Sequence, residues 1–195
     1  MRSNQLIGVL GIGGCGLNAL NYIIDNIQMN ADNEAFIVAN GSNKYLFYAI
    51  DRNKEVLNKS KAQMRWHLSD KLDEISTEEK LETKLQQMVG TCDFVILVSG
   101  GGGQTGSIVT PAIADKLKSL NIPCLAIVVM PFDFEGKKRH EVAESTVNKL
   151  NESCITKVIN NTILQQTEDA SFLQMLNNVN QEIMWLVLNF NKIIE

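Results

Sequence analysis

The sequence has no pair of cysteines at metal-binding spacing, and its four cysteines lie far apart, at positions 15, 92, 124 and 154. A structural zinc site is therefore unsupported, and the reducing cytoplasm is the simplest setting. No apolar run reaches transmembrane length. The first five residues lead directly into a short apolar run that is typical of a buried strand and not of a signal peptide. We therefore expect a cytoplasmic protein without membrane insertion.

Positive charge is also scarce. The chain carries 18 lysines and arginines against 22 aspartates and glutamates, a net charge of -4. Since neutralising a nucleic-acid backbone requires clustered basic side chains, we expect no nucleic-acid partner. No internal repeat, low-complexity stretch or Pro/Gly linker interrupts the chain. Residues 1–195 are therefore expected to form one domain with a sizeable core, and no second domain.

Short apolar runs alternate with segments whose apolar residues recur every three or four positions. The runs predict strands over 6–10, 35–39, 94–98, 124–129 and 155–159, and the periodic segments predict helices over 15–27, 105–120 and 135–150. This alternation implies an α/β fold: a Rossmann-like, mostly parallel sheet with helices on both faces. The stretch from 41 to 91 shows the least clear pattern, and its charge-rich part, 51–86, is expected to form two or three solvated helices. Ligands of such a sheet bind at the carboxyl ends of its strands.

Residues 171–195 are predicted to form a long C-terminal helix, because apolar side chains recur there at spacings of three and four. Met184–Leu188 is apolar over five consecutive residues, so this part of the helix is apolar around its whole circumference. One domain covers only one side of a helix. The hypothesis is that self-association or a partner buries the other side. The alternative is a helix sunk in the core beneath the 41–91 segment.

The first glycine loop directly follows the first predicted strand. It reads Gly-Ile-Gly-Gly-Cys-Gly over residues 11–16, and glycines with free amides at a helix start favour an anion. The loop also fits the dinucleotide fingerprint G-x-G-x-x-G, a weak signal because tight helix–strand packing produces the same pattern. A dinucleotide site needs an acid at the end of the second strand to hold a ribose hydroxyl. Asn40 holds that place, which counts against NAD.

The middle loop is more specific. Four consecutive glycines, 100–103, follow a buried strand, and Gln-Thr-Gly-Ser at 104–107 then opens a helix. A plain turn needs only one or two glycines. The entropic cost of four indicates backbone amides that wrap a phosphate tail, with the hydroxyls of Thr105 and Ser107 as further donors. The loop lacks the lysine of G-x-x-x-x-G-K-[ST], so it is not a P-loop.

A third segment, Pro-Phe-Asp-Phe-Glu-Gly-Lys-Lys-Arg, occupies residues 131–139 after the fourth predicted strand. Gly-Gly-x-Thr-Gly-Ser at 102–107 resembles the tubulin signature G-G-G-T-G-[ST]-G. The first loop, continued to residue 21, resembles G-x-G-G-x-G-x-N-A-V-N of FtsZ, the bacterial cell-division tubulin. Residues 131–139 resemble its P-F-x-F-E-G-K-x-R, and residues 158–164 its I-P-N-D-x-L-L. The sequence therefore resembles the N-terminal GTP-binding domain of the tubulin/FtsZ family over roughly 6–194, with a weak patch at 41–91.

The resemblance implies that the chain binds GTP or GDP, and it is compatible with a magnesium ion. The residues implied for nucleotide binding are Gly13, Gly14, Cys15, Gly16, Asn18, Asn40, Gly102, Gly103, Gln104, Thr105, Gly106, Glu135, Arg139, Asn160, Asn180 and Gln181. The glycine loops would cradle the phosphates, and Glu135 and Arg139 would hold the ribose side. These two residues also fit a plain surface pair four positions apart. The family has an acid where either Asn180 or Gln181 stands, and an aromatic residue where Leu176 stands.

Several departures from the family pattern bear on function. Gln104 and Ile108 replace signature glycines, and no glycine occurs from 42 to 89, where the family has a loop that touches the terminal phosphate. In the family, the central helix leads to an acidic loop that enters the next subunit's pocket and positions the attacking water. The 195 residues contain no such loop. We therefore expect little or no GTP hydrolysis by this chain alone.

The function expected is that of a GTP-binding, FtsZ-like protein related to cell division or the cytoskeleton. Its partners would be a second copy or a full-length FtsZ-like subunit that supplies the acidic loop for hydrolysis, and it would cap or modulate filaments. One alternative is an NAD(P)- or FAD-binding Rossmann oxidoreductase built on the first glycine loop, although no catalytic pair is evident. Another is a non-catalytic interaction module whose nucleotide pocket has decayed.

Overall fold

The computed structural model describes residues 5–27, 36–37, 43–69, 78–161 and 171–194. The strands are β1 (Leu6–Ile12), β2 (Phe36–Ile37), β3 (Lys44–Asp51), β4 (Met64–His67), β5 (Phe94–Gly100), β6 (Cys124–Val129) and β7 (Ile155–Ile159). The helices are α1 (Gly13–Asn26), α2 (Lys54–Asn58), α3 (Glu78–Val89), α4 (Gln104–Ser119), α5 (Lys137–Asn151), α6 (Phe172–Leu188) and α7 (Asn191–Ile194), with a 3-10 turn, η2, at Asp133–Glu135.

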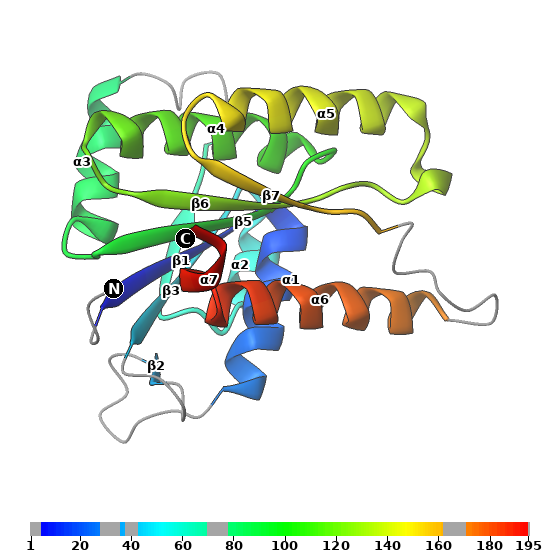
Figure 1. The fold of residues 1–195 in the computed structure, drawn as a ribbon, viewed down its shortest axis with the longest axis horizontal. Helices are drawn as coiled ribbons and strands as arrows, with labels where there is room; N and C mark the ends of the chain where they lie inside the picture. The colour runs from blue at the N-terminus through cyan, green and yellow to red at the C-terminus, as the bar shows by residue number, and fades with distance from the viewer. Residues whose placement is uncertain (1–4, 28–35, 38–42, 70–77, 162–170, 195) are drawn as a thin grey trace.

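The strands form one sheet in the order β2-β3-β1-β5-β6-β7, with β4 also paired to β3. All pairs are parallel except β2 with β3. Helices α4 and α5 cover one face, and α1 and α6 lie on the other (Figure 1). The expected α/β fold, a mostly parallel sheet with helices on both faces, is therefore confirmed. Because the central strands run parallel, their carboxyl ends meet along one edge of the molecule.

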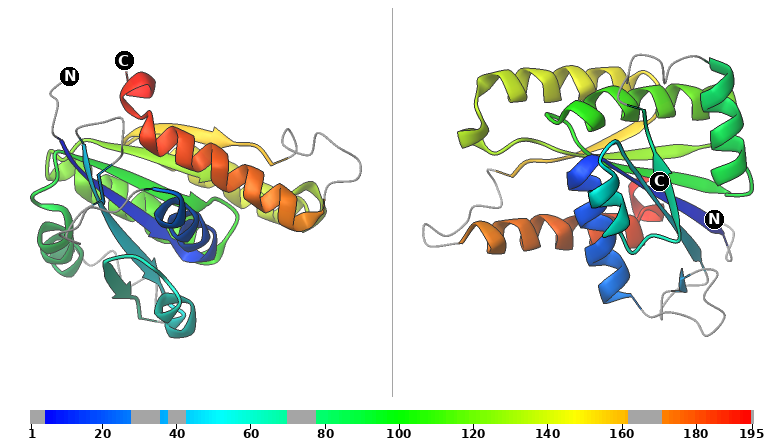
Figure 2. Two further views of the ribbon diagram at one scale, coloured as in Figure 1. Left: turned by 90° about the horizontal axis from the view of Figure 1, so that it is seen from below. Right: turned by 180° about the vertical axis from the view of Figure 1, so that it is seen from behind.

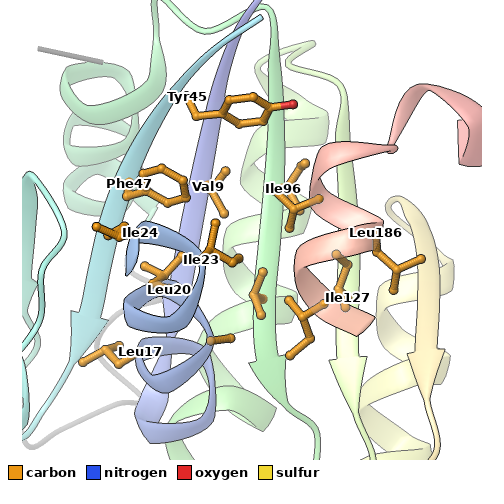
Figure 3. Packing of buried hydrophobic residues seen from close by; sticks show 14 of the residues in the cluster. Val9, Leu17, Leu20, Ile23, Ile24, Tyr45, Phe47, Ile96, Ile127 and Leu186 are labelled. Carbon is orange, nitrogen blue, oxygen red and sulfur yellow. The ribbon is translucent and has the colours of Figure 1, made fainter. Parts of the chain in front are cut away.

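The central strands β1, β3, β5 and β6 are buried on both faces, and their alternate side chains enter two separate cores. On β1, Ile7 and Val9 belong to one core, while Leu10 and Ile12 belong to the other. The first core lies between the sheet, α1 and α6, as Figure 3 shows from close by. The second lies between the sheet and helices α3 and α4. Burial on both faces explains why these strands appear in the sequence as continuous apolar runs.

The stretch from 43 to 69 contains more strand than helix, although helices were expected from residue 51 onward. It forms β3, which lies next to β1 in the centre of the sheet, then the short α2 and the strand β4. The helical prediction is correct only for α2 and α3. Tyr45 and Phe47 fill one core and Tyr48 and Ile50 the other, so β3 has the two-sided burial of a central strand. Because charged residues follow Asp51, the apolar pattern of this strand was not recognised in the sequence.

The strand predicted at 35–39 is also corrected. Only Phe36–Ile37 is a described strand, and it pairs antiparallel with β3 at the edge of the sheet. The second parallel strand is β3, and it ends in an acid, Asp51. The argument against NAD assumed that no acid ends the second parallel strand, and that assumption was wrong. The Asp51 carboxylate is nonetheless only 7% exposed and accepts a hydrogen bond of 2.8 Å from the Asn53 backbone amide. Asn40 lies outside the described residues.

The C-terminal helix is shorter than predicted, since α6 ends at Leu188. The Asn189 side chain donates to the Trp185 carbonyl, and the chain then turns so that Phe190 packs on Phe94, with ring centroids 4.9 Å apart. Of the five apolar residues from 184 to 188, two are buried, two half-buried and only Trp185 is exposed. Helix α1 and the sheet supply most of the cover (Figure 2). In the part of the chain that the structure describes, no helix is long and apolar enough to cross a membrane.

Candidate functional site

Four loops meet at the carboxyl ends of β3, β1, β5 and β6, which are consecutive in the sheet. They enclose two adjoining cavities. The small cavity, of about 200 Å³, is lined by Ile12, Gly13, Gly14, Cys15, Arg52, Gly100, Gly103, Gln104, Thr105 and Gly106. The large cavity, of about 940 Å³, extends from the same loops toward η2, α1 and α6. Both cavities share Gly14, Cys15, Gly100 and Gly103, so the two glycine loops of the sequence border one continuous hollow.

The glycines of these loops serve two different purposes. A Cβ atom at Gly16 would lie 2.3 Å from the Val98 carbonyl oxygen, and one at Gly106 would lie 2.3 Å from the Gly100 carbonyl oxygen. These glycines permit close packing of the helix against the strand. By contrast, a Cβ at Gly14 would meet nothing within 4 Å, and one at Gly103 only the Gly100 carbonyl at 3.9 Å. Packing does not explain Gly14 and Gly103, which instead leave the backbone open to the cavity.

Two helices begin at the small cavity without a side-chain cap. The N-caps are Ile12 for α1 and Gly103 for α4, and neither side chain accepts a hydrogen bond from the first turn. The two starts are in contact, since a Cβ at Gly13 would lie 3.4 Å from the Cβ of Thr105. First-turn amides that lack a capping side chain are donors for an anion, and both helix dipoles place positive potential here. The small cavity is therefore suited to a phosphate.

Cys15 lies where the two cavities join. Burial and the nearby carboxylate of Glu135 raise the pKa of its thiol to about 12. The thiol is thus protonated near neutral pH, which makes it a poor nucleophile. Cys15 is a small neutral lining residue of the loop.

Glu135 and Arg139 form an ion pair at the start of α5, and both side chains line the large cavity. The Glu135 carboxylate also accepts a hydrogen bond of 2.9 Å from the Phe132 backbone amide. Gly136, at φ 94°, makes the turn between η2 and α5 that lets the two residues face each other. The two residues form the ion pair that the surface-pair interpretation expects, and they also border a cavity, as the ligand interpretation requires. Both interpretations are therefore compatible with their position.

The far end of the large cavity is apolar and aromatic. Phe132 stacks on Phe134 with ring centroids 5.2 Å apart, and Phe172 of α6 approaches Phe132 at 5.6 Å. Phe172 and Leu173 are 53% and 67% exposed, so a broad apolar surface borders the hollow. A flat aromatic ligand group fits such a surface. The amide side chain of Asn180 lies on the same wall.

The structure brings most of the predicted residues together. Around the two cavities lie Gly13, Gly14, Cys15, Asn18, Gly102, Gly103, Gln104, Thr105, Gly106, Glu135, Arg139 and Asn180. Gly16 packs against β5 behind the loop. Asn160 and Gln181 are exposed and line neither cavity, whereas their neighbours Asn161 and Asn180 line the large one.

Sequence reasoning missed Arg52, Asn161 and Phe172. Arg52 follows β3, a strand that was not predicted, so nothing in the sequence placed it near the glycine loops. Asn161 is 3% exposed and donates to the Met130 carbonyl at 2.6 Å. Its place one residue after the predicted Asn160 is within the error of a strand boundary. Phe172 lies one helical turn before Leu176, a spacing that would have indicated the same helix face.

A magnesium ion fits the described residues poorly. Mg²⁺ is usually held by one or two carboxylates together with phosphate oxygens and water. Among the residues that the structure describes, no group of three or more His, Cys, Asp or Glu side chains gathers at one place. The small cavity has no described carboxylate in its lining, and its charged residue is Arg52.

Solved structures with the same fold define the class of protein. FtsZ of M. jannaschii, as an empty dimer, superimposes with a TM-score of 0.76 at 20% identity over 96% of this chain and 54% of that one. CetZ2 from Haloferax volcanii, in a protofilament bound to GTPγS, gives 0.73 at 16% identity over 93% and 56%. This chain thus shares the fold of slightly more than half of each of these two chains.

Sequence comparison then gives the family. The model of the "Tubulin/FtsZ family, GTPase domain" matches residues 6–169, and this chain belongs to that family. The cell division protein FtsZ of Haemophilus influenzae is 28% identical over 174 residues, which are 81% of this chain and 41% of the relative. FtsZ of Coxiella burnetii is 31% identical over 175 residues, 83% of this chain and 42% of the relative. The chain therefore spans about two fifths of the length of these relatives.

Proposed function

We propose that this chain binds GTP and GDP in the two joined cavities and acts with other FtsZ-like subunits in a cytoskeletal or cell-division role. The observation that carries the proposal is the convergence of two uncapped helix starts, α1 and α4, on one small cavity. Gly14 and Gly103 leave the backbone there open to a ligand. This arrangement favours a phosphate tail over a plain packing turn.

The proposed places of the phosphates, the ribose and the base follow from the way the small cavity adjoins the large one. The phosphate tail lies in the small cavity, and the large cavity receives the ribose and the base. Glu135 accepts from ribose hydroxyls, while the ion pair with Arg139 holds that carboxylate in place. The base packs on the apolar wall of α6 beside Leu176 and Phe172, and Asn180 hydrogen-bonds to its edge. Asn18 and Asn161 supply further amide groups to the nucleoside.

Hydrolysis belongs to an assembly of subunits in this proposal. The lining described above holds donors for phosphate and no described carboxylate in the small cavity that would activate a water molecule. An acidic loop from a partner subunit, a second copy or a full-length FtsZ-like protein, completes the site. Because the chain presents the nucleotide-bearing surface, it caps or modulates a filament. The free thiols at all four cysteines are in keeping with a cytoplasmic setting.

Calorimetric titration tests the binding proposal. The purified chain is titrated with GTP, GDP, ATP and NAD⁺, and each heat curve is fitted for stoichiometry and Kd. We expect one site for GTP and GDP and at least tenfold weaker binding of ATP and NAD⁺, because the base contacts and the cavity suit a guanine mononucleotide. Stoichiometric binding of NAD⁺ would favour the oxidoreductase, and no binding of any nucleotide at millimolar concentration would favour the interaction module.

A further inference from the structure

Arg52 is the charged side chain of the small cavity. It follows Asp51, the last residue of β3, and β3 is the neighbour of β1 in the sheet. The carboxyl end of β3 therefore delivers Arg52 beside the first glycine loop. Arg52 lines the small cavity and is absent from the lining of the large one. It thus stands at the end of the hollow that is farther from the base.

Several hydrogen bonds hold the backbone around Arg52. The Arg52 carbonyl is 2.8 Å from Nε2 of His67 on β4. On the next residue, the Asn53 amide donates to Asp51, and the Asn53 side chain caps α2 by accepting from the Glu55 and Val56 amides. The loop is thus anchored to a strand on one side and to a helix on the other. Arg52 is consequently positioned by the fold before any ligand arrives.

The guanidinium of Arg52 is only partly used. Its Nη2 donates to Oε1 of Gln104, the first residue of α4, over 2.8 Å. Its Nε is buried and has no hydrogen-bond partner among the described residues. A buried donor without a partner is costly, and a guanidinium offers a rigid planar set of donors that matches phosphate oxygens. The place of this guanidinium in the lining of the small cavity points to an anion as its ligand.

We propose that Arg52 binds the terminal phosphate of GTP, with Gln104 as the positioning residue that holds its guanidinium toward the small cavity. The inference rests on the proposed function, because it assigns one end of the same nucleotide site. A terminal phosphate in the small cavity would accept from Arg52 on one side and from the amides at Gly103 and Gly14 on the other. Arg52 thereby supplies positive charge where the described lining offers no carboxylate for a metal ion.

Two consequences distinguish this assignment from a general phosphate contact. GDP has no terminal phosphate at this position, so Arg52 discriminates GTP from GDP. A fixed guanidinium also neutralises charge without a divalent cation, so tight GTP binding persists when magnesium is removed. The side chain of Gln104, which replaces a signature glycine, contributes to binding by orienting Arg52.

The test measures Kd for a non-hydrolysable GTP analogue and for GDP, each with magnesium and with excess EDTA. The proteins are the wild-type chain, Arg52→Gln, Arg52→Lys and the control Arg65→Gln. Arg65 is a fair match because it also donates through a guanidinium, to the Ser60 carbonyl at 2.6 Å, and lines neither cavity. Thermal unfolding of each variant reports whether the fold is intact.

We expect Arg52→Gln to weaken binding of the GTP analogue by about ten- to hundredfold in EDTA, the range for a lost charged hydrogen bond. GDP binding should change less than about threefold, Arg52→Lys should fall between wild type and Arg52→Gln, and Arg65→Gln should bind as wild type. Equal losses for both nucleotides, unchanged affinity in Arg52→Gln, or loss of wild-type GTP binding in EDTA would overturn the inference alone. A wild-type chain that binds neither nucleotide in magnesium would overturn the proposed function itself.

Discussion

Single residues in the two glycine loops differ in what a side chain would meet, and this separates structural positions from ligand positions. A Cβ atom added at Gly16 or Gly106 would lie 2.3 Å from a carbonyl oxygen, whereas one added at Gly14 would meet open space. In the sequence, Gly14 and Gly16 belong to the first glycine loop and Gly106 to the middle one. The packing interpretation of the first loop is therefore right for Gly16, and Gly106 has the same kind of close contact in the middle loop. We propose that a ligand approaches at Gly14.

A pair of alanine substitutions tests this separation. Gly106→Ala should cost about 1–3 kcal/mol of folding free energy or more, because the new methyl group collides with backbone at Gly100. Gly14→Ala should leave stability within about 0.5 kcal/mol while weakening GTP binding by about tenfold, since the methyl group enters the space for the phosphates. Urea unfolding and calorimetric titration measure the two quantities. Unchanged GTP affinity in Gly14→Ala would contradict the assignment of this glycine to the ligand.

The protonation of Cys15 predicts its reactivity. Because its pKa is raised to about 12 from an ordinary value of 9.0, the thiolate is scarce at pH 8. Alkylation of Cys15 by iodoacetamide should be at least about tenfold slower in the native chain than in the chain unfolded in urea. Cys154 is an internal comparison, since a hydrogen bond with Cys124 lowers the pKa of its thiol. Mass spectrometry of the labelled peptides gives both rates, and fast native labelling of Cys15 would contradict the assigned environment.

The same shift makes stability depend on pH in a defined direction. The folded state holds the Cys15 proton more tightly than the unfolded state does. Its contribution is therefore complete below pH 9 and declines as pH rises from 9 toward 12. Cys15→Ser removes this contribution. Comparing the urea midpoints of the two proteins at pH 8 and pH 10 should show that the wild type loses more stability over that interval.

Among the elements, α6 packs in the first core and also borders the large cavity. Its inner face places Ile183 and Val187 in the first core, while its first turns border the large cavity. The turn after Asn189 buries Phe190 to 1% exposure. Removal of that anchor should loosen the C-terminal end of the helix. The apolar circumference noted in the sequence thus serves the core on most sides, with Trp185 left exposed.

Two substitutions of an aromatic residue by alanine compare the buried turn after α6 with the exposed side of the helix. Phe190→Ala should cost about 3–5 kcal/mol, the usual loss for a fully buried ring. Trp185→Ala should cost less than about 1 kcal/mol, because the indole is 51% exposed. Chemical denaturation of both variants gives the comparison. A larger loss for Trp185→Ala would mean that the indole is buried in solution by a contact between chains.

The elements also show how far the sequence could predict the fold. Strands β1, β5, β6 and β7 were predicted within about two residues. For β1, β5 and β6 the reason is that burial on both faces produces a continuous apolar run, whereas β7 is largely exposed at the edge of the sheet. Strand β3 was missed, since charged residues follow it and no glycine marks its end. The error removed Arg52 from the predicted site. The loops of β1, β5 and β6 were placed correctly because glycine and proline punctuate them.

At the scale of the whole molecule, the chain matches the GTPase domain of a family whose relatives are more than twice as long. Solved relatives include an FtsZ dimer and a CetZ2 protofilament. Within the described residues, the carboxyl-end loops present the cavities on one edge of the molecule, where a neighbouring subunit has access. We therefore propose that this chain binds the nucleotide and that hydrolysis requires a complex of subunits.

Turnover of GTP tests that division. The chain alone should release phosphate slowly, and addition of a full-length FtsZ that lacks its own nucleotide-binding activity should raise the rate, because the partner supplies the acidic loop. Phosphate release at several partner concentrations measures the effect. Brisk turnover by the isolated chain would show that its own residues complete the site.

A crystal structure of the chain with a non-hydrolysable GTP analogue tests the central claim most directly. The account predicts that the phosphates lie in the small cavity, within hydrogen-bond distance of the amides near Gly14 and Gly103, with the base against α6. A nucleotide bound at another place, or one whose phosphates contact only one of the two glycine loops, would contradict it.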